Sequence, residues 1–419
     1  MIRSRARRGR LFLPLFFLFC MLAPLCAESG ESPRVRAVMV QGLTRTKLSV
    51  VEPYYSPYIG KPWGASSREE LVQELRGIGL FHSIEIFTEP AGEDIDIIIA
   101  LEEKWTLIPL PFAVTTQKGT MGGIIFLESN FLGYNKQIYA GGVISTQGDL
   151  QGMVAYTDPK IFGTDFSGNF FFSGGINETQ LVTKDDKVWH EYATMDYIVR
   201  TGISREIFSD FSLGAGAGFL DRWVDKDFSR TYSPPDSVRF ITASLTARYK
   251  DLTYGEVLSY GAQFSGSTRR FFSLRKNVDS YTEYEASLRY HKELPGGHRL
   301  GFFASGTYIP GAPFIQEKEM GGKLFKTLPE GFPADCAAYG QISCELITLR
   351  FSSLVFTLLA AYEAEVFSLN GSPPETSQGP GGGFRLYLSK VAFPALGADV
   401  SYNVKTRKTY ASVFMGVSY

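Results

Sequence analysis

The chain contains little cysteine and little histidine, and this scarcity limits the chemistry that it can perform. Among 419 residues there are four cysteines and four histidines. Only Cys336 and Cys344 lie beyond the N-terminal segment, and a disulfide would require their Cα atoms to approach within about 7 Å. We interpret them as unpaired thiols. The histidines lack the spacing of a metal site, and we find no nucleophile–base constellation. We therefore expect no metal, no cofactor and no enzyme activity.

Long apolar runs are absent after the first 27 residues, so no transmembrane helix is predicted. The best candidate, residues 354–361, is short and is followed by Glu363 and Glu365. A membrane protein with this sequence would have to span the bilayer as a β-barrel. The reason is that lipid cannot satisfy the hydrogen bonds of an open strand edge.

The first 27 residues have the pattern of a secretory signal. Five arginines precede an apolar run at residues 11–22, and small residues follow at Ala23 and Ala27. We expect cleavage after Ala27. This removes five of the 42 basic residues and no acidic one, which leaves 37 basic against 43 acidic residues, a net charge of about −6. That balance does not favour nucleic acid as a partner.

Residues 28–104 predict a small α/β domain with the order strand, helix, helix, strand, strand. "RVRAVMVQGL" has strand character, and "TKLSVVEPYYSPY" predicts a helix interrupted by Pro53. "SSREELVQELRGIGLF" predicts a second helix, which Gly77 and Gly79 end. Ser67 and Glu70 match a capping box at its start. "HSIEIFTEP" and "DIDIIIALEEK" predict the last two strands.

From Trp105 onward, short alternating segments follow one another between turns. "FSLGAGAGF", for example, places Phe211, Leu213 and Phe219 on one face and only Gly and Ser on the other. A soluble sandwich would carry charge on its polar face, whereas here that face is rich in Gly, Ser and Thr with isolated charges of both signs. The apolar face often ends in Tyr or Phe, which is typical of lipid outside and aromatic girdles. We predict a mostly β protein whose residues 105–419 form a transmembrane antiparallel β-barrel of about 16 strands.

The connections between the strands predict the sidedness of the barrel. Long links fall near residues 176–191, 221–237, 269–279, 311–337 and 370–379, and each follows an odd-numbered strand. Bacterial barrels place short turns in the periplasm and long loops outside. Residues 28–104 are therefore expected in the periplasm. The last strand, residues 411–419, is expected to pair with the first, residues 106–114, because an open edge would be exposed in lipid.

Several motifs resemble one family. "VQGLTRTK", "GLFHSIEI" and "IIIALEEKWTLIPLPF" look like a polypeptide-transport-associated (POTRA) domain that runs into its barrel. "ESNFLGYNK", "VAYTDPKIFGTDFSG" and "KDLTYG" resemble turn motifs of the BamA/TamA-like outer-membrane assembly superfamily, which includes two-partner secretion transporters. For "TDPKIFGT", a simple turn and a functional role both stay open. One POTRA-like unit is present, whereas family members of known function commonly have two or more.

The segment "PFIQEKEMGGKLFKTLPEGF" lies between predicted strands 11 and 12, where the superfamily carries a long loop that enters the lumen. The family loop usually has an Arg-Gly pair after its two glycines. Here Gly321 and Gly322 are followed by Lys326 in place of the arginine. An ammonium lacks the bidentate fork of a guanidinium. Lys326 is expected to meet one of three carboxylates in the lumen: Glu345, Glu363 or Glu365.

The resemblance implies an outer-membrane barrel that inserts or translocates other polypeptides. Its implied partners are outer-membrane lipid, unfolded outer-membrane or secreted polypeptides, and periplasmic accessory proteins. A POTRA edge can bind an extended client by main-chain pairing; the expected residues are His82, Ser83, Ile84, Glu85, Ile86, Phe87 and Thr88. A weak barrel seam can template incoming strands; the expected residues are Thr106, Leu107, Ile108, Pro109, Ala411, Val413, Gly416 and Tyr419. The alternatives are a secretion pore for one dedicated exoprotein and a structural porin or surface antigen.

Overall fold

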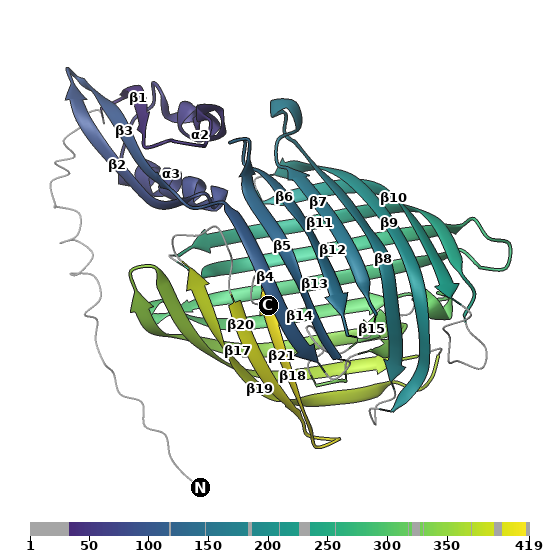
Figure 1. Cartoon of the computed structure of the whole chain (residues 1–419). Helices are drawn as coiled ribbons and strands as arrows, with labels where there is room; N and C mark the ends of the chain where they lie inside the picture. The colour runs from purple at the N-terminus through teal and green to yellow at the C-terminus, as the bar shows by residue number, and fades with distance from the viewer. Residues whose placement is uncertain are drawn as a thin grey trace, which may run out of the picture.

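The computed structural model describes residues 33–116, 119–146, 148–182, 187–208, 210–225, 235–255, 257–316, 318–320, 327–329, 331–369, 371–388 and 396–415. They form a small N-terminal domain and one large curved sheet (Figure 1). The expected secretory signal lies outside the described residues.

The N-terminal domain has the predicted order of elements. It contains β1 (Val35–Gln41), α2 (Leu48–Tyr55), the 3-10 turn η1 (Ser56–Tyr58), α3 (Ala65–Ile78), β2 (Phe81–Ala91) and β3 (Asp94–Glu103). Pro53 lies inside α2, and the chain continues as η1 soon after it. Among the described residues, no helix is long and apolar enough to cross a membrane.

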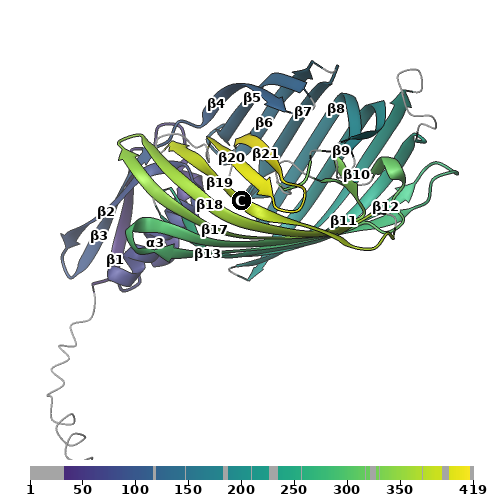
Figure 2. The same ribbon diagram turned by 90° about the horizontal axis from the view of Figure 1, so that it is seen from below.

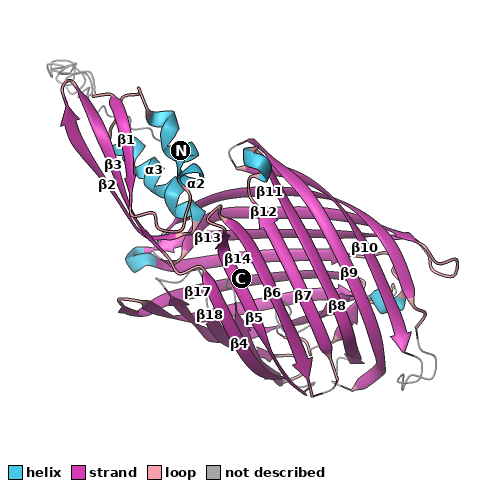
Figure 3. Ribbon diagram, turned by 45° about the horizontal axis from the view of Figure 1, so that its top comes forward, coloured by secondary structure: helices cyan, strands magenta, loops and turns pink. Residues whose placement is uncertain are grey.

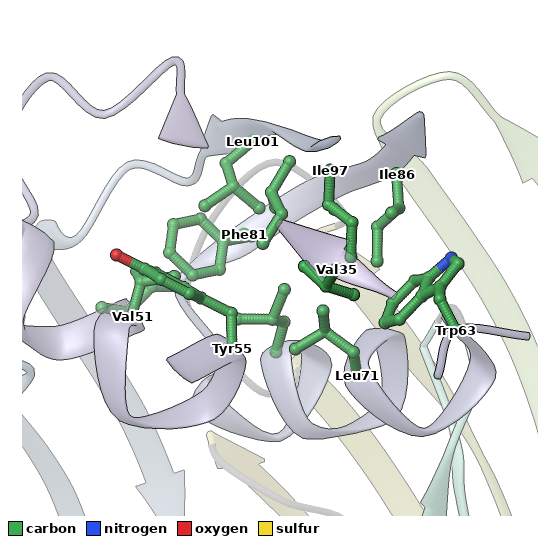
Figure 4. Packing of buried hydrophobic residues seen from close by; sticks show 12 residues of the cluster. Val35, Val51, Tyr55, Trp63, Leu71, Phe81, Ile86, Ile97 and Leu101 are labelled. Atoms are coloured by element: carbon green, nitrogen blue, oxygen red, sulfur yellow. The ribbon is translucent and has the colours of Figure 1, made fainter. Parts of the chain in front are cut away.

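The core of this domain lies between its two helices and one face of its three-stranded sheet (Figure 4). β3 is the central strand, parallel to β1 and antiparallel to β2. Ile97 and Ile99 of β3 are fully buried because alternate residues of a strand share one face. They pack with Leu71 and Leu75 of α3, which lie four residues apart on one helical face.

The predicted capping box at the start of α3 is wrong. The helix begins at Ala65, so Ser67 is its third residue, and the N-cap is Gly64 without a side-chain hydrogen bond. The predicted end is confirmed at Gly79, whereas Gly77 lies inside the helix. Gly79 has φ +82° and its N–H donates to the carbonyl of Arg76, a left-handed position that glycine adopts at little cost.

The large sheet contains 16 strands, all paired antiparallel, which confirms the predicted number (Figures 2 and 3). Each pairs with its neighbours in chain order, from β4 at one end to β21 at the other. The strands are β4 (Leu107–Thr116), β5 (Gly119–Phe131), β6 (Lys136–Ser145), β7 (Leu150–Asp158), β8 (Phe166–Val182), β9 (Val188–Phe208), β10 (Phe211–Asp225), β11 (Val238–Tyr254), β12 (Ser259–Ser273), β13 (Tyr281–Leu294), β14 (His298–Tyr308), β17 (Cys336–Phe351), β18 (Leu354–Ser368), β19 (Glu375–Leu388), β20 (Leu396–Asn403) and β21 (Lys408–Met415).

The sheet has an apolar outer face and a polar inner face. Leu213, Leu245 and Leu288 are 42–62% exposed on the outer face, as the alternation predicts. The opposite face, here called the interior, carries Gly, Ser, Thr and charged residues. At the end of the sheet away from the N-terminal domain, the interior also contains an apolar cluster that includes Phe240 and Phe271.

The five connections predicted to be long follow β8, β10, β12, β14 and β18, which are odd-numbered strands of the sheet. The difference in length is smaller than predicted, because the links after the even-numbered strands β7 (159–165) and β19 (389–395) are longer than those after β8 (183–187) and β18 (369–374). The expected link at residues 176–191 is wrong in extent, because β8 runs to Val182 and β9 begins at Val188. The expected link at 269–279 is likewise shortened, since β12 runs to Ser273. These strands extend because Leu181, Tyr192 and Phe271 are buried in the interior apolar cluster.

Candidate functional site

The predicted client-pairing segment lies at an edge of the N-terminal sheet. Its residues belong to β2, which pairs only with β3 among the described residues. Ile86 points into the domain core, whereas Phe87 is 51% exposed on the other face. His82 lies at an irregularity in the β2–β3 register, and its Nε2 is 2.6 Å from Glu102 Oε2. The geometry of an available edge is therefore present, and client pairing stays a prediction.

Glu103, the last residue of β3, binds the segment that precedes α2. Its carboxylate accepts hydrogen bonds from the Thr44 hydroxyl (2.6 Å), the Arg45 N–H (3.0 Å) and the Thr46 N–H (2.8 Å). Burial opposes ionisation, but these hydrogen bonds outweigh it and hold the pKa of Glu103 below its ordinary value. Glu103 thus fixes residues 44–46 beside the point where the chain enters the large sheet.

The same segment docks onto the turn between β5 and β6. Asn130 Nδ2 donates to Thr46 Oγ1 (2.9 Å), and the Lys47 N–H donates to the carbonyl of Gly133 (2.9 Å). Gly133 has φ +81°, and a Cβ there would lie 2.2 Å from the Arg45 carbonyl oxygen. Only glycine permits this close approach.

Two further contacts join the domain to other turns at this end of the sheet. The Tyr254 N–H at the end of β11 donates to Gln73 Oε1 of α3 (3.1 Å). Lys160, in the turn after β7, lies 5.5 Å from the ring centre of Tyr54. The domain therefore reaches from the turn after the second strand of the sheet to the end of the eighth, and it lies across that end of the sheet (Figure 1).

The replacement Glu103→Gln is expected to loosen this docking. It removes the negative charge and replaces one of the two accepting oxygens by an NH2 donor, which costs at least about 1 kcal/mol, or a population of the open state raised about fivefold or more. Because the folded pKa is depressed, the stabilisation is present above the unfolded pKa of about 4.3 and is lost as the pH falls through the folded value. Hydrogen exchange at the Thr46 and Lys47 amides measures both effects.

Glu102→Gln is the matched control, because this neighbouring glutamate contacts His82 instead. We expect the opening equilibrium of the wild type, obtained after correction for the intrinsic exchange rate, to be independent of pH from 6 to 8. Below about pH 4 we expect it to shift toward the open state. An exchange rate in Glu103→Gln equal to that of the wild type at pH 7 would contradict the role of Glu103.

The predicted seam lies at the two ends of the large sheet. Leu107, Ile108 and Pro109 belong to β4, which pairs with β5 alone among the described residues. Thr106 precedes β4, is buried, and accepts a hydrogen bond at its carbonyl from Ser129. The ladder to β5 continues past Pro109 and Pro111 without a register shift. This is the arrangement expected if their missing donors face the free edge.

At the other end, Ala411 and Val413 belong to β21, which pairs with β20. The strand begins at Lys408, three residues earlier than predicted, because its ladder continues to Asn403. Gly416 and Tyr419 lie outside the described residues. No ladder joins the described parts of β4 and β21; closure of the barrel through this seam stays a prediction.

A long connection between β14 and β17 folds into the interior, and we call residues 309–335 the interior loop. It contains η4 (Phe314–Gln316) and the short paired strands β15 (Lys318–Met320) and β16 (Phe332–Ala334). On one wall, Arg222 of β10 donates to the Ile315 carbonyl (2.7 Å) and forms a bidentate pair with Asp196 of β9. Ile315 itself is buried in the interior apolar cluster.

The opposite wall binds the interior loop at Thr327, which is fully buried. The Thr327 hydroxyl lies 2.7 Å from Glu365 Oε1 of β18 and 2.8 Å from the Ser377 hydroxyl of β19. Asn403 of β20 donates to the Thr327 carbonyl (2.8 Å). Described parts of the loop therefore contact two opposite walls of the interior. Gly321, Gly322 and Lys326 lie outside the described residues.

Of the three predicted loop partners, Glu365 contacts the described part of the loop at Thr327. All three carboxylates are interior-facing and about 1% exposed. Glu363 accepts from the Tyr339 hydroxyl (3.0 Å), and Glu345 accepts from Arg299, Thr357 and Tyr387 of the wall at 2.5–2.8 Å. Their predicted partner Lys326 lies outside the described residues, so its pairing with any of the three carboxylates stays a prediction. Glu365 is reached because it lies near the end of β18 that adjoins the loop.

No sequence pattern identified Thr327, Ser377 and Asn403 as loop-binding residues. Thr, Ser and Asn are common on the interior face. The available signals were that Thr327 follows Lys326 in the sequence and that Ser377 and Asn403 occupy interior-facing positions of their strands. Among the described residues, no group of three or more His, Cys, Asp or Glu could hold a metal ion. Among the described residues, the arrangement offers main-chain hydrogen bonding at the edge of β2 and at the end strands β4 and β21 of the large sheet.

Comparison with solved structures identifies the fold. The chain is similar to CdiB from Escherichia coli (TM-score 0.64, 11% identity, 89% of this chain and 73% of that one). It is also similar to CdiB from Acinetobacter baumannii (TM-score 0.60, 14% identity, 91% of this chain and 73% of that one). A third similar structure is BamA from Haemophilus ducreyi lacking POTRA domains 1-3 (TM-score 0.53, 13% identity, 91% of this chain and 85% of that one). No protein-family model and no curated protein sequence matches the chain. At the level of the fold, these likenesses confirm the expected resemblance to the BamA/TamA-like superfamily and the two-partner secretion transporters.

Proposed function

We propose that this protein is an outer-membrane β-barrel that assists the insertion or translocation of other polypeptides. In this proposal the N-terminal domain is a POTRA-like unit in the periplasm, and residues 105–419 close into the barrel. One observation carries the proposal. A 16-stranded sheet of the BamA and CdiB type is preceded by a domain whose strand β2 is an available edge.

The mechanism follows from main-chain pairing. An extended client pairs with the free edge of β2. Its backbone N–H and C=O groups then form hydrogen bonds with β2 in place of their hydrogen bonds with water. The client then reaches the end strands β4 and β21. Pro109 and Pro111 each remove a donor from β4, which weakens its pairing with β21 and lets a client strand pair with the edge instead.

A secretion pore for one dedicated exoprotein is the second candidate. The higher TM-scores to the two CdiB structures favour it over an insertase. The interior loop and the docked domain weigh against it, because cargo would have to displace both. In the insertase, by contrast, clients pass along the seam and these contacts can stay in place.

Depletion of the protein in its native host tests the proposal. We expect the mature chain in the outer membrane with heat-modifiable gel mobility, and a loss of many other outer-membrane barrels after depletion. The loss of one secreted protein alone would select the secretion pore. Unchanged levels of all outer-membrane and secreted proteins would leave only a structural porin or surface antigen.

A further inference from the structure

A cluster of arginines and aromatic rings lies on the outer face of the sheet, at the end away from the N-terminal domain. The guanidinium carbons of Arg239 and Arg275 lie 5.6 and 5.1 Å from the ring centre of Trp223. That of Arg270 lies 6.0 Å from the ring centre of Phe272. We call these five residues the arginine–aromatic patch.

The register places the patch on the outer face. Phe219 pairs with Ile241, which pairs with Phe272, and these three side chains are 37–49% exposed. Trp223 is also exposed, whereas the intervening residues Leu220, Phe240 and Phe271 are buried in the interior apolar cluster. The guanidiniums of the patch are thus set among apolar side chains that face away from the interior.

Charge in the patch is incompletely balanced. Arg239 is paired with Asp221 at 2.6 Å, and Arg270 donates to the Thr282 hydroxyl at 3.0 Å. Within the described residues, Arg270 and Arg275 form no ion pair, and Arg275 Nε is buried without a hydrogen-bond partner. Arginine on a lipid-facing surface is destabilising at the bilayer centre and tolerated near the headgroups. In the proposed membrane location the patch therefore lies at headgroup level, and Asp221 is the one carboxylate paired with it among the described residues.

We infer that the arginine–aromatic patch binds a lipid whose headgroup carries more than one phosphate. A guanidinium binds phosphate through two parallel N–H donors, and the two unpaired arginines can each hold one phosphate. Trp223 and Phe272 hold the guanidinium planes by cation–π contact. Ile241 and Leu274 are 49% and 52% exposed beside them and provide apolar surface for acyl chains. The inference rests on the proposed membrane location, but not on the proposed handling of clients.

The test uses the purified mature chain in zwitterionic detergent, with folding checked by heat-modifiable mobility. Native mass spectrometry follows titration with bisphosphorylated lipid A, dephosphorylated lipid A and phosphatidylglycerol. We expect the bisphosphorylated lipid to bind at least about tenfold more tightly than the other two, and Arg270→Gln with Arg275→Gln to remove about that factor. Arg205→Gln is the matched control, because Arg205 lies over Phe166 on the outer face at the opposite end; it should bind like the wild type.

Equal binding of the phosphorylated and dephosphorylated lipids by the wild type would overturn the inference, and this comparison needs no variant. Equal or tighter binding of phosphatidylglycerol would overturn the choice of lipid. An equal loss of binding in Arg205→Gln would show that the patch is not the site. Chains that never acquire heat-modifiable mobility would instead contradict the proposed barrel, so the two failures are distinguishable.

Discussion

Joining β4 to β21 by a disulfide is expected to abolish the insertion of client barrels while leaving this protein folded. Each variant carries one cysteine in each strand, at an interior-facing position. Ser412 of β21 is combined either with Ile108 or with Leu110 of β4. The background is Cys336→Ser and Cys344→Ser, since both native thiols are free. A covalent link removes lateral opening, and no client strand can then pair with either edge.

The measurement is the amount of folded client barrel in cells that depend on the cross-linked protein, with and without reductant. Ser265→Cys with Ser287→Cys is the matched control, because these residues are directly opposed in the β12–β13 ladder far from the seam. Its disulfide should leave insertion unchanged. If the seam-locked protein still supports assembly of other barrels, the lateral route is wrong, and a pore or a structural role is preferred.

Replacing Thr327 by valine is expected to release the interior loop from its second wall. The hydroxyl contacts Glu365 and Ser377 in a fully buried setting, so its loss leaves a buried carboxylate short of a donor. Such a loss costs about 1–3 kcal/mol, and valine has nearly the same shape. Limited proteolysis within residues 309–335, at a temperature where the barrel stays heat-modifiable, should become at least several-fold faster.

Thr327→Ser keeps the hydroxyl and is the control, expected to behave like the wild type. Cleavage of Thr327→Val at the wild-type rate would mean that other contacts, such as that of Arg222 with Ile315, hold the loop in place by themselves.

Local patterns were sufficient for the elements of this chain. Alternation with period two predicts 16 strands and their outer faces, because lipid and interior impose opposite demands on successive side chains. In the N-terminal domain, Leu71 and Leu75 identify the buried face of α3, and Gly79 identifies its end. The start of α3 was mispredicted because Ser67 and Glu70 match a capping box by sequence alone, whereas the helix had already begun at Ala65.

The sequence by itself thus determined the class of fold, the number of strands and the position of the loop between strands 11 and 12. Only the tertiary structure decided which groups meet in the interior. Thr327 is 38 residues from Glu365 and 76 from Asn403. Such contacts depend on the register of the strands and on how deep into the interior the loop lies. Neither property is encoded in a local sequence pattern. The docking of Thr46 and Gly133 also required the fold, because two separate turns must approach until only a glycine fits.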